Sequence, residues 1–335
     1  MHKPTSVADI RALASDLPKA DKTSIDAARA RQNQLTKPPG SLGTLEDIAV
    51  FMAGWQGTGT PKIDTAQALV FAGNHGICAQ GVNPFPQEVT AQMVANFEAG
   101  GAAINQLCNA NGATLSVIAL DLDRPTADFT EAPAMNDADL KTALQTGFDA
   151  VDPKAQIIIL GEMGIGNSTV AAALACACFG GAASDWVGAG TGSDADGINL
   201  KARVIDAGIA RHGRNDPLQT LANLGGREQA AICGAVLGAR AHRIPVLLDG
   251  YICTAAVAPL AAETPAFLDH CLIGHASAEP GHARLMTAMN KSPILDFNMR
   301  LGEGTGAALA LGIVRSALAC HNGMATFAEA GVSGG

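Results

Sequence analysis

Hydrophobic and polar positions follow two different patterns along the chain, and each pattern predicts a different kind of element. Near the amino terminus, apolar residues recur at intervals of three and four over 25–35 and 44–55, which is the spacing of amphipathic helices. The segment between them, 37–41, is rich in Pro and Gly, a composition typical of a rigid turn. This part of the chain is therefore predicted to form two helices that flank a turn.

From about residue 66 onwards the chain instead contains short, continuous apolar runs, most of them ending in Gly or Asp. Such runs are typical of parallel strands that are buried on both faces. We expect strands at 68–73, 114–121, 157–161, 184–188 and 245–250. Helical segments are expected at 88–110, 168–178 and 307–320. Strands that alternate with helices indicate the α/β class, with a doubly wound, Rossmann-like parallel sheet whose ligands bind in the loops at the strand ends.

Composition agrees with a folded α/β protein. The 335 residues are 48% hydrophobic and only 16% charged, which excludes a disordered chain. Lys and Arg number 22 against 31 for Asp and Glu, a net charge of −9, so we expect no nucleic-acid partner. The eight cysteines form no CxxC pair and are interpreted as small buried side chains.

The chain carries no predicted signal peptide, because charged residues interrupt its first 18 positions. Its longest apolar stretch, 170–183, is shorter than the roughly 20 residues that cross a bilayer. We therefore expect a cytoplasmic protein without a membrane span.

Candidate chemistry begins in the glycine-rich loop GEMGIGN at 161–167, which follows a predicted strand and precedes a predicted helix. Backbone N–H groups at such a helix start favour an anion such as phosphate. The chain contains no Gly-Lys pair and the loop lacks GxGxxG spacing, so neither a Walker loop nor a dinucleotide fingerprint is predicted. A turn needed only for packing is the alternative, although Glu162 at the tip of a buried strand then requires a partner.

Two further loops carry charged residues beside glycines. The loop GAGTGSD at 188–194 is followed by Lys201, and backbone N–H groups with one ammonium group suit a phosphate monoester. Lys201 can equally be a solvated surface lysine. In RLGEGTG at 300–306, Glu303 either stabilises the start of the next helix, by about 0.3–1 kcal/mol, or acts as a base, which requires burial and a raised pKa.

A metal centre and a serine nucleophile are not predicted. His275, Glu279 and His282 have the spacing HxxxExxH, but Pro280 and Gly281 interrupt the helix that would align them. The chain contains no HExxH, CxxC or GxSxG motif.

Eight segments, in this order, resemble the nicotinate-nucleotide:dimethylbenzimidazole phosphoribosyltransferase family over about residues 30–333. One departure is Asn74, where many relatives have Asp, so no acid role is expected for that side chain. The segments are KPPGSLG with Leu45-Glu46 (37–46), AGNHG (72–76), VTAQM (89–93), GEMGIGN (161–167), GAGTG (188–192), GGRE (225–228), LDG (248–250) and RLGEGTG (300–306).

The resemblance implies an enzyme of cobalamin lower-ligand assembly. Such an enzyme converts nicotinate mononucleotide and 5,6-dimethylbenzimidazole to α-ribazole 5′-phosphate and nicotinate, without a cofactor. The resemblance also implies a homodimer. Each subunit would have a large α/β domain at 61–295 and a small helical domain formed by 1–60 plus 296–335.

The resemblance also implies roles for individual residues. Glu303 is expected to be the general base and Glu162 the second catalytic carboxylate. The pocket for the aromatic acceptor base is expected to include Gln92, Met163 and Leu301. Apart from the resemblance, the loop 84–86 is a candidate for part of its wall, with ordinary turn chemistry as the alternative. The residues expected to bind the phosphate and the rest of the nucleotide are Gly164, Gly166, Asn167, Gly188, Ala189, Gly190, Lys201, Asp249, Ser277 and Arg300.

The reaction's chemistry fits these residue types. Attack by one benzimidazole nitrogen requires loss of the proton on the other, so a carboxylate in an apolar pocket is a suitable base. Nicotinate leaves a cationic pyridinium ring as a neutral nitrogen, so neither a general acid nor a metal is required. A second carboxylate, Glu162, can stabilise the oxocarbenium charge at C1′ while the phosphate fixes the ribose for inverting attack.

Three other functions remain as alternatives at this stage. A phosphoribosyltransferase for another acceptor, such as adenine or a phenol, would share the nucleotide loops but differ around Gln92 and Met163. A binding protein without catalytic activity would hold the nucleotide and release no nicotinate, and it would have no use for two carboxylates beside an anionic ligand. A dinucleotide dehydrogenase is disfavoured by the spacing of the glycine loops.

Overall fold

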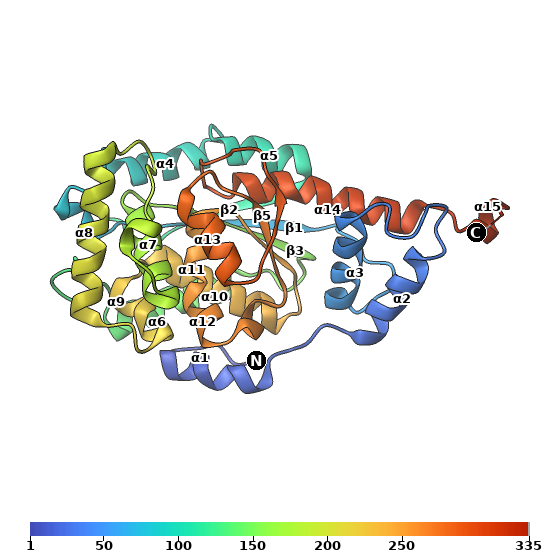
Figure 1. Ribbon diagram of the computed structural model, residues 1–335, viewed down its shortest axis with the longest axis horizontal. Coiled ribbons are helices and arrows are strands. Elements are labelled where there is room, and N and C mark those ends of the chain that lie inside the picture. Colours follow the sequence, from blue (N-terminus) through green and yellow to red (C-terminus); the bar gives the residue numbers. More distant parts are fainter. Residues whose placement is uncertain (334–335) are drawn as a thin grey trace.

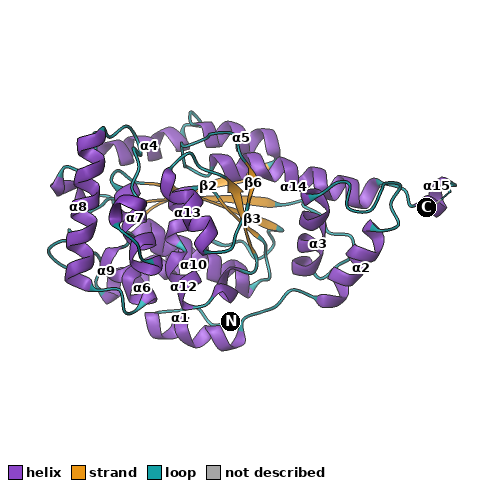
Figure 2. Cartoon of the chain, in the orientation of Figure 1, coloured by secondary structure: helices purple, strands orange, loops and turns teal. Residues whose placement is uncertain are grey.

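A single parallel sheet forms the centre of the molecule in the computed structural model, which describes residues 1–333 (Figures 1 and 2). Its strands have the spatial order β2-β1-β3-β4-β5-β6, and every neighbouring pair is parallel. This arrangement confirms the predicted α/β class. The strands are β1 (Ala66–Ala72), β2 (Ala113–Ala119), β3 (Ile157–Met163), β4 (Val246–Leu248), β5 (Cys271–His275) and β6 (Pro293–Leu295).

Helices connect the strands and cover both faces of the sheet (Figure 2). The predicted helical segment 88–110 is two helices, which are separated by a turn at Gly100 and Gly101. The helices are α1 (Val7–Leu13), α2 (Lys22–Gln32), α3 (Thr44–Gln56), α4 (Glu88–Glu98), α5 (Ala103–Asn111), α6 (Asp137–Ala150), α7 (Asn167–Phe179), α8 (Ala195–His212), α9 (Pro217–Leu224), α10 (Arg227–Ala241), α11 (Tyr251–Ala256), α12 (Ala258–Glu263), α13 (Pro280–Ala288), α14 (Thr305–Gly323) and α15 (Phe327–Ala330).

The strand predicted at 184–188 is wrong. Residues Ala183–Asp185 form a single 3₁₀ turn between α7 and α8. The chain turns sharply just before it, because Gly180 and Gly181 both have positive φ, 76° and 84°. Trp186 then anchors the segment: its ring is fully buried and its indole N–H donates to the Gly180 carbonyl at 2.8 Å. A large apolar side chain next to Val187 therefore indicates packing here, not sheet pairing.

Alternate residues of β1, β3, β4 and β5 belong to two separate hydrophobic cores, as the period of two in a strand requires. In β3, Ile158 and Leu160 pack in the core that includes α7 and α10. Their neighbours Ile157 and Ile159 pack in the core that includes α3, α5 and α14. Burial on both faces explains why the strands are continuous apolar runs in the sequence.

The two ends of the chain meet away from the sheet. Helices α2 and α3 pack against each other, α3 packs against α14, and Arg31 donates hydrogen bonds to the carbonyls of His321, Asn322 and Met324. Helices α2 and α3 and the carboxyl-terminal part of α14 form the narrow extension on the right of Figure 1. Helix α1 instead packs against α9. The division into domains at 61–295 and at 1–60 plus 296–335 stays a prediction.

No helix within residues 1–333 combines the length and the apolarity that crossing a membrane requires.

Candidate functional site

A cavity of 380 Å³ opens at the carboxyl edge of the sheet. The loops that follow β3, β4 and β5 line it together with the loop before α14. The sheet order reverses between β1 and β3, and ligands of doubly wound folds bind beside such a reversal. The predicted site residues that line the cavity are Glu162, Met163, Gly164, Gly166, Asn167, Gly190, Lys201, Asp249, Ser277, Arg300, Leu301 and Glu303.

Three predicted site residues lie outside the lining of this cavity. Gly188 lies just behind it, where its carbonyl accepts a hydrogen bond from Lys201 Nζ at 3.3 Å, and Ala189 is its neighbour in the chain. Gln92 is exposed on α4. The residues of α4 that line the cavity are Val89 and Met93, which are four positions apart and therefore share a face of the helix.

Glu303 projects from a strained turn directly before α14. Its φ is 63°, and Gly302 and Gly304 on either side have φ of 86° and 85°. Such a conformation costs about 1–3 kcal/mol for a residue other than glycine, and cases of this kind concentrate at functional sites. The side chain is only 7% exposed. Burial, with a smaller contribution from the charge of Asp249, raises the pKa of Glu303 to about 7.

Asp249 fixes the position of this turn. It follows β4, and its carboxylate accepts hydrogen bonds from the backbone N–H of Gly304 at 3.0 Å and of Ala307 at 2.9 Å. His275 Nε2, at the end of β5, lies 3.6 Å from the same carboxylate. Burial raises the pKa of Asp249, while His275 and the backbone N–H groups oppose that rise. The aspartate thus joins the sheet to the first turn of α14.

Glu162 lies at the end of β3 and touches the Glu303 turn from the other side. One carboxylate oxygen accepts a hydrogen bond from the Asn167 side-chain amide, and the other lies 3.5 Å from the backbone nitrogen of Glu303. Burial is the largest reason why the pKa of Glu162 stands well above its usual value, and the charges of Asp249 and Glu228 raise it further. Two acidic side chains from distant parts of the sequence thus meet at one wall of the cavity.

A buried contact between a histidine and a glutamate lies beneath the glycine loop. His75 Nε2 lies 2.9 Å from a Glu228 carboxylate oxygen, and both side chains are fully buried. Gly164 packs directly on this pair: a Cβ there would lie 3.1 Å from His75 Nε2 and 2.5 Å from the Gly73 carbonyl oxygen. The AGNHG and GGRE segments therefore act beneath the cavity, where they require glycine at position 164.

The opposite end of the cavity carries the cationic residues. Lys201, on α8, is 3% exposed, and its Nζ also lies 3.4 Å from Ser168 Oγ. Burial lowers the pKa of Lys201, and the negative charge of Glu279 opposes that change. Gly190 has φ of 55°. Arg300 Nη1 donates to its carbonyl at 3.2 Å, which ties the 188–194 loop to the loop before α14.

Apolar side chains form a wall of the cavity that contains Glu303. They are the side chains of Phe85, Val89, Met93, Met163 and Leu301. Phe85 and Leu301 remain 47% and 57% exposed, which is high for large hydrophobic residues. The wall therefore suits a flat apolar ring, and Phe85 brings the 84–86 loop into the lining as expected.

The sequence interpretation missed several lining residues. Ser168 directly follows the GEMGIGN segment, and no role in the site was expected for it. Glu279 was considered only as part of a metal motif. Tyr251 and Ile252 carry no signal beyond following the LDG segment. Among residues 1–333, no group of three or more His, Cys, Asp or Glu is arranged to hold a metal ion.

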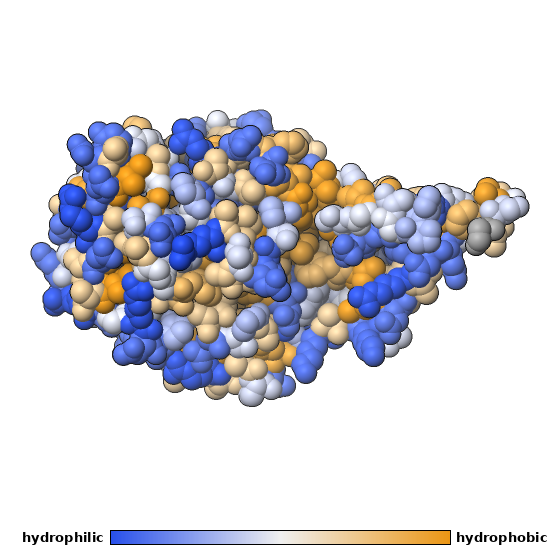
Figure 3. Space-filling view, viewed as in Figure 1, coloured by the Kyte–Doolittle hydropathy of each residue, from blue (hydrophilic) through white to orange (hydrophobic). Residues whose placement is uncertain are grey.

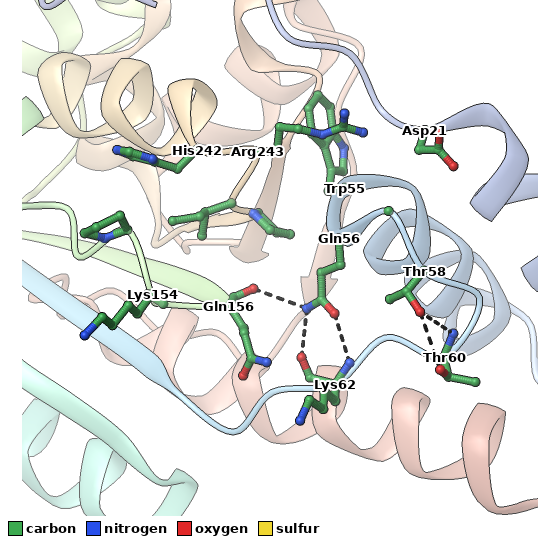
Figure 4. A pocket seen from close by; sticks show the side chains of 15 residues that line it. Asp21, Trp55, Gln56, Thr58, Thr60, Lys62, Lys154, Gln156, His242 and Arg243 are labelled. Atoms are coloured by element: carbon green, nitrogen blue, oxygen red, sulfur yellow. Dashed lines mark hydrogen bonds between the residues drawn. The ribbon is translucent and has the colours of Figure 1, made fainter.

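A second cavity, of 880 Å³, lies at the amino edge of the sheet (Figure 4). Lys62, Lys154, His242 and Arg243 line it, and of the described residues that do so only Asp21 is acidic. Gln56 crosses its floor and hydrogen-bonds both the N–H and the carbonyl of Lys62, at 3.0 Å and 2.8 Å. Lys62, Lys154 and His242 are exposed. This cavity contains no buried acid, so it offers no comparable base.

Comparison with known proteins finds relatives that match nearly the whole chain. A model of a family described as phosphoribosyltransferase matches residues 17–332. The nicotinate-nucleotide–dimethylbenzimidazole phosphoribosyltransferase of Rhodobacter capsulatus is 63% identical, over 98% of each chain. That of Roseobacter denitrificans is 58% identical, over 98% of this chain and 97% of its own.

Solved structures extend the match to three dimensions. The crystal structure of nicotinate-nucleotide-dimethylbenzimidazole phosphoribosyltransferase from Thermus thermophilus superimposes with a TM-score of 0.87 at 37% identity. The superposition covers 94% of this chain and all of that one. This chain belongs to the nicotinate-nucleotide–dimethylbenzimidazole phosphoribosyltransferase family.

Proposed function

We propose that the protein transfers the phosphoribosyl group of nicotinate mononucleotide to 5,6-dimethylbenzimidazole, with Glu303 as the general base. Family membership supports the reaction. The observation that carries the role of Glu303 is its place in the cavity: a buried carboxyl group with a pKa of about 7 stands beside an apolar wall. A base with a pKa near the working pH is the most effective kind.

The reaction needs one proton transfer and one displacement. Glu303 removes the proton from one nitrogen of dimethylbenzimidazole while the other nitrogen attacks C1′ of the ribose. The bond between C1′ and the pyridinium nitrogen breaks, and its electron pair leaves with nicotinate. Attack from the face opposite the leaving group converts the β-nucleotide to the α-ribazole 5′-phosphate product.

Glu162 stabilises the developing positive charge at C1′. Burial and the charges of neighbouring acids raise the pKa of Glu162 well above its usual value. A pyridinium ring or an oxocarbenium-like ribose placed beside it favours the ionised form, because opposite charges lower the pKa of an acid. A cationic substrate beside Glu162 therefore favours the carboxylate form, whose charge stabilises the transition state.

The phosphate group is assigned to the cationic end of the cavity. Lys201 and the N–H groups of Gly164 and Gly190 form its cradle. Met163 and Leu301 contact the acceptor base, and Gln92 remains a candidate for that pocket. The other residues proposed to contact the nucleotide or to shape its loops are Gly166, Asn167, Gly188, Ala189, Asp249, Ser277 and Arg300.

We also propose that two copies of the chain associate. Phe297 is 62% exposed and, like Phe85 and Leu301, is a large apolar side chain without cover. Figure 3 shows further hydrophobic residues over the visible parts of α14 and α3. Large apolar side chains left exposed in this way support an interaction surface between two copies. The small helical domain and the cytoplasmic location stay predictions.

Nicotinate release from nicotinate mononucleotide, measured with and without 5,6-dimethylbenzimidazole, tests the proposal. We expect release that depends on the benzimidazole and yields one α-ribazole 5′-phosphate per nicotinate. Adenine and a phenol serve as alternative acceptors. Faster turnover with either would assign the protein another acceptor, and nucleotide binding without any release would contradict the catalytic proposal.

A further inference from the structure

A carboxylate occupies the proposed phosphate cradle. Glu279 stands in the loop between β5 and α13 and lines the cavity. Its Oε1 accepts a hydrogen bond from the backbone N–H of Gly190 at 3.0 Å. This N–H is one of the donors assigned above to the phosphate, so in the empty site it already has an anionic acceptor.

The surrounding backbone fits closely around this carboxylate. A Cβ on Gly188 would overlap Glu279 Oε2 and lie 3.1 Å from its Cδ, so the carboxylate lies along the loop from Gly188 to Gly190. Ser277 Oγ accepts a hydrogen bond from the Glu279 N–H at 3.3 Å, which holds the start of the side chain. A Cβ on Gly190 would lie 3.1 Å from Lys201 Nζ. The carboxylate and the ammonium group therefore flank the same glycine.

We propose that Glu279 is an internal competitor for the substrate phosphate and thereby sets how strongly the site prefers a phosphorylated nucleotide over its nucleoside. The inference rests on the cradle assigned under the proposed function. A phosphate oxygen that takes the Gly190 N–H must displace the Glu279 carboxylate. The two anions also repel each other across the small cavity. Binding the phosphate therefore exchanges one charge-assisted hydrogen bond for another. The phosphate gains less binding free energy than it would in a cradle that holds no carboxylate.

The same competition favours release of the product. After the transfer, the phosphate of α-ribazole 5′-phosphate occupies the cradle, and the returning carboxylate replaces it at Gly190. Loss of the Glu279 charge is therefore expected to slow product release as well as to strengthen substrate binding.

The experiment compares equilibrium binding of nicotinate mononucleotide and of its nucleoside, which lacks the phosphate, to four proteins by calorimetry. The proteins are the wild type, Glu279→Gln, Lys201→Met and Glu98→Gln. Glutamine keeps the shape of the side chain but removes its charge. Glu98 is exposed at the end of α4, so its substitution changes the net charge by the same amount and leaves the cradle intact.

We expect Glu279→Gln to bind the mononucleotide about tenfold more tightly than the wild type, with no gain for the nucleoside. Glu98→Gln should bind both ligands as the wild type does. Equal or weaker binding of the mononucleotide by folded Glu279→Gln would overturn the proposal. Glu279→Ala removes the acceptor altogether and must show the same direction of change.

Lys201→Met separates this inference from the function on which it depends. If that variant loses affinity for the mononucleotide while Glu279→Gln gains none, the cradle is correct and only the competition is wrong. If Lys201→Met binds the mononucleotide as the wild type does, the phosphate lies elsewhere, and both the cradle and the competition are overturned.

Discussion

The two edges of the sheet carry cavities of opposite character. The cavity at the amino edge is the larger, 880 Å³ against 380 Å³, but Lys62, Lys154 and His242 in its lining are exposed and, within residues 1–333, the single acid there is Asp21. The smaller cavity, at the carboxyl edge, contains Glu162, Asp249 and Glu303, all at least nine-tenths buried. Volume therefore does not identify the site of reaction in this molecule, whereas the cost of burying three acids does.

The backbone shows the same contrast. Both cavities contain a residue other than glycine with positive φ, Arg243 at 58° in the larger and Glu303 at 63° in the smaller. Only Glu303 is held on both sides, by Asp249 through Gly304 and by Glu162 through its own N–H. The same unusual conformation is thus a local turn at one edge and part of a connected acidic cluster at the other.

The largest effect is expected when the proposed base, at the carboxyl edge, is replaced. Glu303→Gln is expected to lower kcat by about a thousandfold, within the range for loss of a general base. Affinity for nicotinate mononucleotide should change little, because the phosphate is held at the other end of the cavity. Single-turnover nicotinate release and calorimetry measure the two quantities. Equal losses in turnover and in affinity would assign Glu303 to binding.

Asp249→Asn tests whether the acidic cluster holds the fold of the carboxyl edge. The substitution weakens two hydrogen bonds from backbone N–H groups to a buried charged acceptor, so the free energy of unfolding should fall by about 2 kcal/mol. Denaturant unfolding measures the change. The matched control is Asp269→Asn at the amino edge, where a 58% exposed carboxylate lies 3.7 Å from Arg240. Asp269→Asn should lower the free energy of unfolding by less than about 1 kcal/mol. A decrease as large as that caused by Asp249→Asn would contradict the expected difference between the two edges.

The smallest effect is expected for a substitution in the larger cavity. Arg243→Gly relieves a left-handed conformation and removes a guanidinium nitrogen that is buried without a hydrogen-bond partner. We expect a change in unfolding free energy of under about 1 kcal/mol and an unchanged kcat. A clear loss of nicotinate release in this variant would show that the amino edge takes part in function.

Sequence patterns predicted the sheet best where burial on both faces gives a long apolar run. β1, β2 and β3 were found, as was β4. β5 was missed because its five residues include Gly274 and His275, and β6 because it has three residues and begins with proline. The pattern has no means of distinguishing such short strands from loops, since only their neighbours in the sheet keep them extended.

Glu162 and Glu303 were predicted because each lies next to glycine at the edge of the sheet, a local feature. Asp249 was expected only from the family resemblance. Glu279 was missed as part of the cradle because its partner, the Gly190 N–H, is 89 positions away in the sequence. Gln92 is a similar case. The motif identifies the segment that reaches the cavity, but which face of α4 meets the cavity depends on how the helix packs.

The pH dependence of kcat in the wild type and in Glu303→Gln tests the central claim most directly. A general base must be ionised, so the wild-type rate should fall as the pH drops through about 7, the raised pKa of Glu303. The residual rate of Glu303→Gln should lack this transition. A wild-type rate that stays constant down to about pH 5, near the ordinary pKa of a glutamate, would contradict the account, as would an unchanged transition in the variant.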